Sequence, residues 1–254
     1  YSWNTLATSS TLDSLEAGTY SVVVTDSMGC TATDSVVVNE APAISDTAVA
    51  TNVSCFGEFD GSIDLTVTGG ALPYTFLWAP GTDTTEDLSG LPFGVYTYVV
   101  IDANLCPIVG NVFVEQPMLL TILQNTTDVT CNGGSDGSIT LTIMGGTPPC
   151  TVFWSNGDTG TSISNLPAGS YIATVTDANG CVTTDSIVIS EPTALVLSTA
   201  VSGVSCNGGS DGSIDLTVSG GSTPYVYSWS TADTTEDLSG LGVGSYTVMV
   251  TDNN

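Results

Sequence analysis

The stretch CNGGSDGSITLTIMGG, residues 131–146, decides the fold of this chain because it recurs almost unchanged. It returns as CNGGSDGSIDLTVSGG at 206–221 and as CFGEFDGSIDLTVTGG at 55–70. The chain's four tryptophans repeat in the same way, at intervals of 75, 76 and 75 residues: Trp3, Trp78, Trp154 and Trp229. A fixed period of this length predicts an array of small, similar modules and not one domain with one cleft.

A proline closes each copy of the repeat. Pro42, Pro117 and Pro192 each lie one or two residues after a glutamate and are spaced by 75 residues. We therefore predict the complete repeats 43–117 and 118–192, preceded by the C-terminal part of a repeat and followed by a repeat without its C-terminus. The two incomplete ranges are 1–42 and 193–254. The chain is expected to be an excerpt of a longer protein, and no stretch has the length of a membrane-spanning helix.

Within a repeat the apolar residues alternate with polar ones. Ile139, Leu141 and Ile143 alternate with threonines, and Val152 and Trp154 share a second strand face with Cys150. No segment shows a helical period, and glycine-containing turns interrupt the strands about every ten residues. This pattern predicts an all-β chain in which each repeat is a small antiparallel β-sandwich of about 75 residues.

A leucine, a glycine turn and a tyrosine recur before one strand of every copy. The segments are LEAGTY at 15–20, LPFGVY at 91–96, LPAGSY at 166–171 and LGVGSY at 241–246. They resemble the corner of immunoglobulin-like domains, where a tyrosine hydroxyl binds upstream backbone. We accordingly assign the tryptophans and these tyrosines to the core and the corner, in preference to a ligand-stacking role.

The chain has no lysine, arginine or histidine and 26 acidic residues, which gives a net charge of −26. Histidine-dependent catalysis, Schiff-base chemistry and histidine-ligated zinc are therefore excluded. Nucleic acid and anionic membranes are not expected as partners.

Asp158-Thr159-Gly160 resembles the aspartic-protease loop, but the equivalent positions read Asp83-Thr84-Thr85 and Asp233-Thr234-Thr235, so we interpret it as a turn. No pair of carboxylates is distinguished from its repeated copies, and we predict that the chain is not an enzyme.

Six of the seven cysteines form two families with fixed places in the repeat. Cys55, Cys131 and Cys206 precede one strand, and Cys30, Cys106 and Cys181 follow a turn near the end of the repeat. Such constancy indicates disulfides and an oxidising, extracellular setting. Cys150 stands where the other copies have Tyr74 and Tyr225, and we predict a lone buried thiol there.

Three pairing schemes remain open for these cysteines. Within a repeat, Cys55 would bond Cys106 and Cys131 would bond Cys181. Strands of about eight residues at ~3.3 Å rise place those two families at opposite ends of a sandwich, roughly 25–30 Å apart, whereas a disulfide spans Cα atoms at most ~7 Å apart. Across a head-to-tail junction, Cys55 would instead bond Cys181, and Cys131 would bond the copy after Asn254. In the third scheme all cysteines are reduced.

Aspartates recur in two turns of the repeat. They lie before the second strand or at the end of a later strand, as Asp60, Asp136, Asp211, Asp102 and Asp177. Asx residues followed by glycine are ordinary turn formers. The alternative is Ca²⁺ bound by these oxygens at the repeat junctions, although the spacing does not match an EF-hand loop. No other cofactor is expected.

Together these motifs resemble the SprB-type repeat, with further similarity to PKD domains. The resemblance rests on CNGGSDGSI (131–139), GGTPP (145–149), the strand ending in Trp154, NLPAGSY (165–171), TVTDANGC (174–181) and SEP (190–192). SprB-type repeats occur in giant cell-surface adhesins of gliding Bacteroidetes and in relatives secreted by the type IX system. The resemblance therefore implies an immunoglobulin-like fold, a place at the cell surface and a connection with gliding motility.

The resemblance also directs attention to sites of O-glycosylation. Tripeptides of aspartate, a hydroxyl residue and a third residue resemble the acceptor motif of such bacteria. The acceptor residues would be Ser14, Ser27, Ser35, Thr47, Thr84, Ser186 and Thr234.

The sequence thus predicts a structural role. We expect a tandem immunoglobulin-like β-sandwich array that extends and stiffens an extracellular filament or adhesin stalk, with neighbouring repeats and other filament chains as partners. The first alternative is a set of repeats that bind carbohydrate or other surfaces weakly and multivalently. The second is a spacer attached to a secreted hydrolase.

Overall fold

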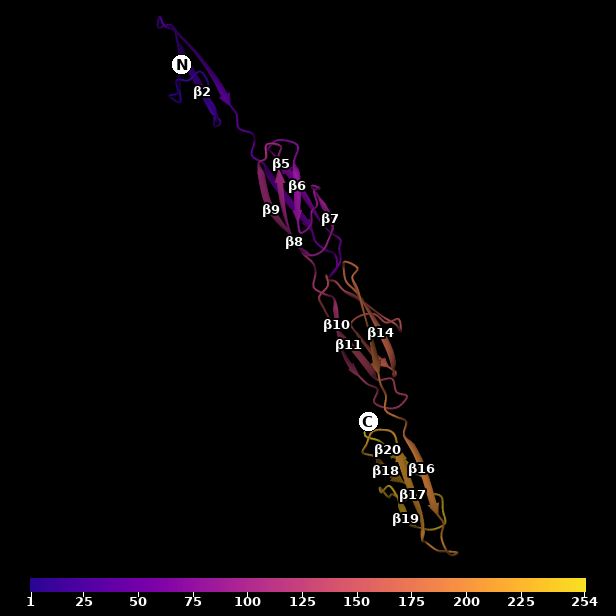
Figure 1. Cartoon of the computed structure of the whole chain (residues 1–254). Helices are drawn as coiled ribbons and strands as arrows, with labels where there is room; N and C mark the ends of the chain where they lie inside the picture. Colours follow the sequence, from indigo (N-terminus) through magenta and orange to yellow (C-terminus); the bar gives the residue numbers. More distant parts are fainter. The chain divides into compact units, whose positions relative to one another are not determined.

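The computed structural model describes all residues from 1 to 254, and every regular element in it is a β-strand. The chain forms two compact units, Tyr1–Gln116 and Pro117–Asn254, which are described separately (Figure 1). The first unit contains one single sheet and one sandwich of two sheets, and the second unit contains two sandwiches of two sheets. The predicted all-β class of small antiparallel sandwiches is confirmed.

The complete repeat of the first unit consists of two three-stranded antiparallel sheets with the orders β4-β5-β7 and β6-β8-β9. Their strands are β4 (Ser45–Thr51), β5 (Gly61–Thr68), β6 (Thr75–Ala79), β7 (Leu88–Leu91), β8 (Gly94–Ile101) and β9 (Pro107–Val114). Both sheets contribute to one buried cluster, with Ile63 and Leu65 from β5 and Trp78 and Val100 from the facing sheet. The period-two alternation in the sequence is the reason, because it gives each strand one apolar face.

The second unit repeats this architecture between residues 118 and 192. The sheets have the orders β10-β11-β13 and β12-β14-β15. Their strands are β10 (Thr121–Thr127), β11 (Gly137–Met144), β12 (Thr151–Trp154), β13 (Ser162–Leu166), β14 (Gly169–Thr176) and β15 (Val182–Ile189). Ile139, Leu141, Val152 and Trp154 lie together in a core cluster, as the alternation predicts.

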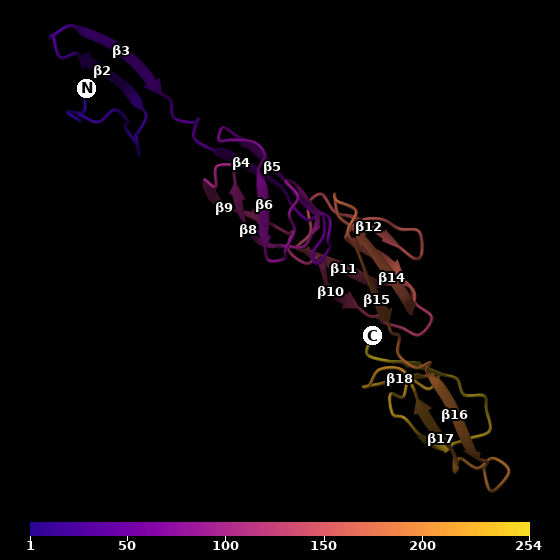
Figure 2. The same cartoon turned by 45° about the horizontal axis from the view of Figure 1, so that its top comes forward.

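The repeat at 193–254 has the first sheet complete but only two strands in the second. Its sheets are β16-β17-β19 and β18-β20, and Figure 2 shows β16 and β17 side by side. The strands are β16 (Val196–Ser202), β17 (Gly212–Ser219), β18 (Val226–Trp229), β19 (Leu238–Leu241) and β20 (Val248–Thr251). A separate cluster built around Ile214, Leu216, Trp229 and Leu238 forms its core.

The repeat at 1–42 has only one sheet. It contains β1 (Ser2–Trp3), β2 (Gly18–Thr25) and β3 (Thr31–Val38), in the order β1-β2-β3. No second sheet covers its apolar face, so Val24 of β2 is 37% exposed whereas Val100, its counterpart in β8, is 0% exposed. The three buried clusters of the chain therefore belong to the three copies that have both sheets.

A pair of glycines connects the first sheet to the second in each of these three copies. Gly145 and Gly146 follow β11 with φ of 72° and 63°. A Cβ on Gly145 would lie 2.0 Å from the carbonyl oxygen of Leu119, and one on Gly146 would lie 3.0 Å from Oδ2 of Asp177. The backbone approaches itself here too closely for any side chain, which explains the repeated Gly-Gly.

Cys150 occupies a position where the hydroxyl of a tyrosine closes this same turn in the other copies. Tyr225 Oη donates to the carbonyl of Gly220 at 2.6 Å, and Tyr74 Oη donates to the carbonyl of Gly69. Cys150 carries a free thiol and is half-buried against the core, so its thiol is less buried than predicted. The carbonyl of Gly145 has no tyrosine donor.

We predict that Cys150→Tyr stabilises the repeat 118–192 by about 1 kcal/mol, because the new hydroxyl can donate to the Gly145 carbonyl as its counterparts do. Chemical denaturation of the whole chain measures the change. Cys150→Phe supplies the ring without the hydroxyl and separates the hydrogen bond from added apolar contact. Equal effects of the two substitutions would contradict the prediction.

Candidate functional sites

Every tryptophan fixes the loop that follows its own strand. Its indole Nε1 donates to a backbone carbonyl six or seven residues later, at 2.9 Å. Trp78 and Trp154 are 0% and 1% exposed. The acceptors are the carbonyls of Ser9, Thr85, Gly160 and Thr235. The prediction that these rings belong to the core is confirmed for the complete repeats.

The four corner tyrosines also have the predicted structural role. Each hydroxyl donates to the carbonyl four residues upstream, at 2.8–3.0 Å. The pairs are Tyr20 with Glu16, Tyr96 with Pro92, Tyr171 with Pro167 and Tyr246 with Gly242. In the repeats 43–117 and 118–192, this bond joins the residue after the last strand of one sheet to a strand of the other sheet.

The protease-like tripeptide at Asp158 is a turn, as predicted. Trp154 N donates to the carbonyl of Asp158 at 2.9 Å, and Asp158 Oδ2 accepts from Asn156 Nδ2 at 2.7 Å. The carbonyls of Asp83 and Asp233 close the same turn in the other copies. The side chain of Asp158 is exposed and is part of the turn's own hydrogen bonds.

Asp177 and Asp102 are the only buried polar residues, at 5% and 4% exposed. Asp177 Oδ1 accepts from Asn179 N and Cys181 N, both at 2.9 Å, and Oδ2 accepts from Thr147 N at 2.7 Å. The carboxylate therefore holds its own turn and joins it to the Gly-Gly turn 30 residues earlier. The backbone N–H of Thr147, followed by those of Cys181 and Asn179, lowers the pKa of Asp177, since these donors favour the charged form.

This lowered pKa predicts acid sensitivity. A carboxyl group with a depressed folded-state pKa contributes stability that is present above its unfolded value, near 3.9, and is lost as the pH falls through the folded value. The melting temperature of the chain should therefore be level above about pH 5 and fall progressively below about pH 4. The pKa of Asp102 is lowered as well, and the largest cause is the backbone N–H of Cys106. Asp102 therefore contributes in the same direction.

The variant Asp177→Asn tests this prediction. An amide offers one acceptor oxygen where the carboxylate offers two, so we expect a lower melting temperature at pH 7 and a smaller drop between pH 5 and pH 2. Thermal melts over this range measure both changes. A pH profile identical to that of the parent chain would count against the assignment, and Asp158→Asn provides an exposed control.

The aspartates just before the second strand of each repeat stabilise the loop that leads into that strand. Asp60, Asp136 and Asp211 each accept, through Oδ1, from the backbone N–H six residues earlier at 2.9–3.0 Å. Asp136 Oδ2 also accepts from Thr130 Oγ1 at 2.7 Å. The pKa of Asp136 is lowered, first by the Thr130 hydroxyl and then by the Thr130 N–H.

The five candidate calcium residues do not gather into one site. No group of three or more acidic or cysteine side chains in the chain is placed to hold a metal ion. The oxygens of Asp60, Asp102, Asp136, Asp177 and Asp211 accept backbone N–H groups instead. The turn-forming interpretation accounts for these contacts, and calcium binding stays a prediction that a melt with and without chelator tests.

The seven cysteines differ in redox state. Cys55 and Cys181 are each disulfide-bonded. The other five are free thiols: Cys30, Cys106, Cys131, Cys150 and Cys206. The within-repeat scheme is therefore not formed, because Cys106 and Cys131, the partners it requires, are free.

The second unit contains a junction between two repeats, and the chain there is held from both sides. Val129 N donates to the carbonyl of Ser190 at 3.0 Å, and Gly221 N donates to the carbonyl of Thr193 at 2.8 Å. Only Glu191 and Pro192 lie between these two anchors. They are bound as well, since Gly133 N donates to Glu191 Oε2 at 2.6 Å and Asn132 Nδ2 donates to the Pro192 carbonyl at 3.1 Å.

At this junction the turn that follows β20 lies against the loop that contains Cys131. Asn254 Nδ2 donates to the carbonyl of Thr130 at 2.6 Å. Cys131, Asn132 and Asn254 line the same open hollow. By repeat spacing, Asn254 corresponds to Asn179, and Thr130 corresponds to Ser54.

The predicted glycosylation acceptors are all accessible. Each of the seven hydroxyl residues has an exposed side chain: Ser14, Ser27, Ser35, Thr47, Thr84, Ser186 and Thr234. Modification of these residues stays a prediction.

One exposed feature was not found from the sequence. Phe93 and Phe113 form an edge-to-face pair with ring centroids 5.2 Å apart, at 49% and 44% exposed. Alternation in β9 places Phe113 on the outer face, but Phe93 lies in a turn and carries no periodic signal. The equivalent positions hold Ala168 and Val188 in the next repeat, so the pair occurs once.

The fold and these turns define a class of protein: a tandem array of small immunoglobulin-like β-sandwich repeats. Within it, the family model of the SprB repeat matches residues 47–83, 123–159 and 198–234. Three segments of the chain are therefore similar to the SprB repeat, a repeat of cell-surface proteins. The matched segments run from the first strand of each repeat to the turn after its tryptophan.

Solved structures give a broader likeness. The amphioxus IgVJ-C2 molecule is 17% identical, with a TM-score of 0.24 over 47% of this chain and 89% of that one. The surface layer protein SbsC, domains 1–6, is 16% identical, with a TM-score of 0.29 over 93% of this chain and 43% of that one. The eight N-terminal immunoglobulin domains of Down Syndrome Cell Adhesion Molecule are 10% identical, with a TM-score of 0.25 over 94% and 51%. This chain thus spans about half of the latter two structures.

No curated protein matches the chain. None of its elements is a helix capable of crossing a bilayer.

Proposed function

We propose that this chain is a segment of an extracellular stalk or filament, which extends and stiffens a cell-surface protein and has no catalytic role. The observation that supports this proposal most is the junction at 190–193. There, the two residues between the anchoring carbonyls are themselves hydrogen-bonded to the preceding repeat. A linker bound in this way limits bending between repeats, which is what a spacer requires and what an isolated binding module does not.

A second observation supports the proposal: polar and aromatic residues that recur in the repeats hold their loops and turns. The tryptophans, corner tyrosines and buried aspartates, which are the residues that usually build a site, are used to hold loops. The net charge of −26 disfavours lateral clumping of neighbouring stalks, because like charges repel within a Debye length of ~8 Å at physiological salt.

Stiffness would be increased by a disulfide across the junction between the two complete repeats. We propose that Cys55 bonds Cys181, since both are oxidised and the remaining cysteines are free. The junction at Asn254 and Thr130 supports this pairing, because their counterparts Asn179 and Ser54 each lie two or fewer residues from Cys181 and Cys55. In the chain-entropy description, a closed loop of this length stabilises the protein by roughly 4–5 kcal/mol.

Thiol counting tests the pairing without any cleavage. Alkylation of the denatured, unreduced chain should label five cysteines, and Cys181→Ser should raise the number to six because it frees Cys55. Cys206→Ser, which removes a free thiol, should lower it to four. Four labels on the Cys181→Ser variant would show that Cys55 is paired with another cysteine of the chain.

Single-molecule stretching tests the stalk role itself. Each repeat should unfold as a separate event that releases roughly 200–250 Å of chain, since an extended residue spans about 3.4 Å. These lengths apply to the reduced chain, because in the oxidised chain a Cys55–Cys181 bond would withhold the residues between the two cysteines, which form most of both complete repeats. One cooperative rupture of the whole chain would contradict a stalk of independent repeats.

The exposed Phe93–Phe113 pair supports a second candidate function, the binding of carbohydrate. Paired aromatic rings can stack on a sugar, but this pair is present in one repeat, which does not fit multivalent binding. Binding of the chain to polysaccharide that is lost in Phe113→Ala would favour this candidate over a purely mechanical role. The role of spacer for a secreted hydrolase is mechanically the same as that of a stalk.

A further inference from the structure

Two rows of apolar side chains cross the outer face of the sheet β6-β8-β9 in the repeat 43–117. The members of a row are cross-strand partners in the antiparallel register, so they lie side by side on the sheet. One row is Leu77, Val99 and Val109, and the other is Val95 and Phe113, on which the ring of Phe93 packs edge to face. Apart from Val99, which is half-buried, these side chains are 44–63% exposed. We refer to these six residues as the apolar face.

The equivalent face of the repeat 118–192 has no such rows. Each exposed apolar side chain of the sheet β12-β14-β15 has a hydroxyl residue as its cross-strand partner. The pairs are Phe153 with Thr174, Ile172 with Ser186, Val188 with Ser170 and Val182 with Thr176. The apolar face is therefore not a consequence of the fold, because the same sheet is built without it in the next repeat.

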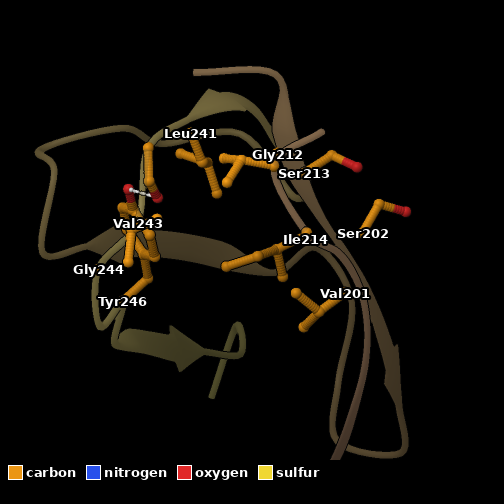
Figure 3. Close-up of a pocket in the computed structure, with 12 residues that line it drawn as sticks. Val201, Ser202, Gly212, Ser213, Ile214, Leu241, Val243, Gly244 and Tyr246 are labelled. Carbon is orange, nitrogen blue, oxygen red and sulfur yellow. Dashed lines mark hydrogen bonds between the residues drawn. The ribbon is translucent and has the colours of Figure 1, made fainter. Parts of the chain in front are cut away.

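The turn before the corner tyrosine differs between copies in the same sense. Phe93 stands in this turn where the other copies have Ala17, Ala168 and Val243. Figure 3 shows the turn in the repeat 193–254, with Val243 next to Gly244 and with the bond that Tyr246 Oη donates to the carbonyl of Gly242. A ring occupies the position only in the repeat 43–117, where it extends the apolar face beyond the first residue of β8.

None of the outward-facing positions of β6, β8 and β9 carries a carboxylate. Besides the apolar face, these positions hold Thr75, Ala79, Thr97, Ile101, Pro107 and Asn111. The other sheet of the same repeat has Asp64 exposed on its outer face. In a chain with 26 acidic residues and no lysine, arginine or histidine, such an uncharged sheet face is where two like-charged chains can touch without opposing carboxylates.

We propose that the apolar face of the repeat 43–117 binds the same face of a second copy of this chain. The contact is isologous, so each copy supplies the same rows to the other. The two outer faces pack about 10 Å apart, as sheets do inside a sandwich. This inference rests on the proposed function, since it assigns the place at which neighbouring stalks touch.

The chemistry of the face favours a copy of the chain over other partners. A cationic protein would be attracted to carboxylates such as that of Asp64, which lie outside this face. A saccharide needs several hydrogen-bonding groups for its hydroxyls, and between the two apolar rows only Thr97 and Asn111 offer them. A copy has an uncharged, apolar face to match, and it is present wherever the chain is.

The size of the face predicts a weak contact. Three strands about 4.8 Å apart and up to eight residues long cover roughly 400 Å² on each copy, or roughly 800 Å² in total. Stable interfaces bury about 1,200–2,000 Å². The net charge of −26 opposes the contact further, so its strength should depend on salt. Between 0.1 M and 1 M salt the screening length falls from about 10 Å to about 3 Å, which removes repulsion and leaves apolar burial unchanged.

Sedimentation equilibrium of the whole chain tests the proposal. The exposed free thiols are alkylated first and a chelator is present, so that neither disulfides nor divalent ions join two chains. We expect a weight-average mass that rises with concentration and an association constant that increases at least threefold from 0.1 M to 1 M NaCl. A dissociation constant weaker than roughly 1 mM in 1 M NaCl, or an association that salt weakens, would overturn the proposal.

Substitutions on the two sheets locate the contact. Phe113→Thr should lower the association constant at least tenfold, and Phe153→Thr is the matched control because Phe153 is also exposed on an outer sheet face. The control should stay within about twofold of the parent. Thermal melts followed by circular dichroism check that both variants remain folded. Equal losses of association in the two variants would refute the assigned face.

A double variant tests the face without changing its rings. Val95→Ser with Val109→Thr places on β8 and β9 the residues that the next repeat has there, Ser170 and Thr184, so the sheet is expected to accept them. It should weaken association at least tenfold as well. An association that Phe113→Thr abolishes and the double variant keeps would confine the contact to the ring pair and overturn the proposal.

The pairing and the stalk role fail separately. A chain that stays monomeric while its repeats unfold one by one under force would overturn the pairing and leave the stalk role standing. Polysaccharide binding that depends on Phe113 in a chain that does not self-associate would also overturn the pairing, and would favour the carbohydrate candidate. One cooperative rupture under force would contradict the stalk role even where the chains pair.

Discussion

Replacing Trp154 with alanine should cost the repeat 118–192 about 3–5 kcal/mol, which is most of the stability that a domain of 75 residues has. The ring is 1% exposed and belongs to the core cluster formed by both sheets of the repeat. Its Nε1 also donates to the Gly160 carbonyl at 2.9 Å, so the substitution leaves a cavity and releases the following loop. Chemical denaturation of the whole chain, followed by circular dichroism, measures the loss.

Phe153→Ala is the matched control for this substitution. Phe153 precedes Trp154 in β12, has a similar size and is 61% exposed on the opposite face. We expect it to change stability by less than about 1 kcal/mol. Similar losses for the two substitutions would mean that the repeat is not held by the face on which Trp154 lies.

A second large effect is expected at the Gly-Gly turn. Gly145→Ala should destabilise the repeat 118–192 by at least about 3 kcal/mol, because its φ is 72° and the new Cβ would lie 2.0 Å from the Leu119 carbonyl oxygen. A left-handed conformation alone costs a residue with a side chain about 1–2 kcal/mol. The remainder comes from the displacement of backbone, which cannot move aside as a flexible side chain can.

Gly157→Ala separates these two contributions. Gly157 has a φ of 94°, and nothing lies within 4 Å of the position of its Cβ. Its substitution should cost only the conformational part, about 1–2 kcal/mol. If denaturation curves of the two variants coincide, the close approach between Gly145 and Leu119 is not what requires glycine in this turn.

The alternating faces of the strands could be predicted because they depend on neighbouring residues. Ile139 and Leu141 face the core and the threonines between them face outward, since successive side chains of a strand point to opposite sides. The turn role of Asp177 was predicted for the same local reason, and its Oδ1 indeed accepts the N–H groups two and four residues later.

The second contact of Asp177 could not be predicted in this way. Its Oδ2 accepts from Thr147 N, 30 residues earlier, and this contact exists only once the two sheets are packed. The state of the cysteines was equally open, because spacing alone allowed three schemes. The free thiols of Cys106 and Cys131 remove the within-repeat scheme, while the bond between repeats stays a proposal.

The sequence by itself determined the repeat, the strand class, the inward faces and the tyrosine corners, because each of these follows from residue spacing along one segment. Only the tertiary structure decided which amides satisfy the buried carboxylates, and that Val114 and Ile189 cover Gly61 and Gly137. Contacts of this second kind join residues tens of positions apart. Their partners are selected by how two sheets pack, for which a local pattern carries no signal.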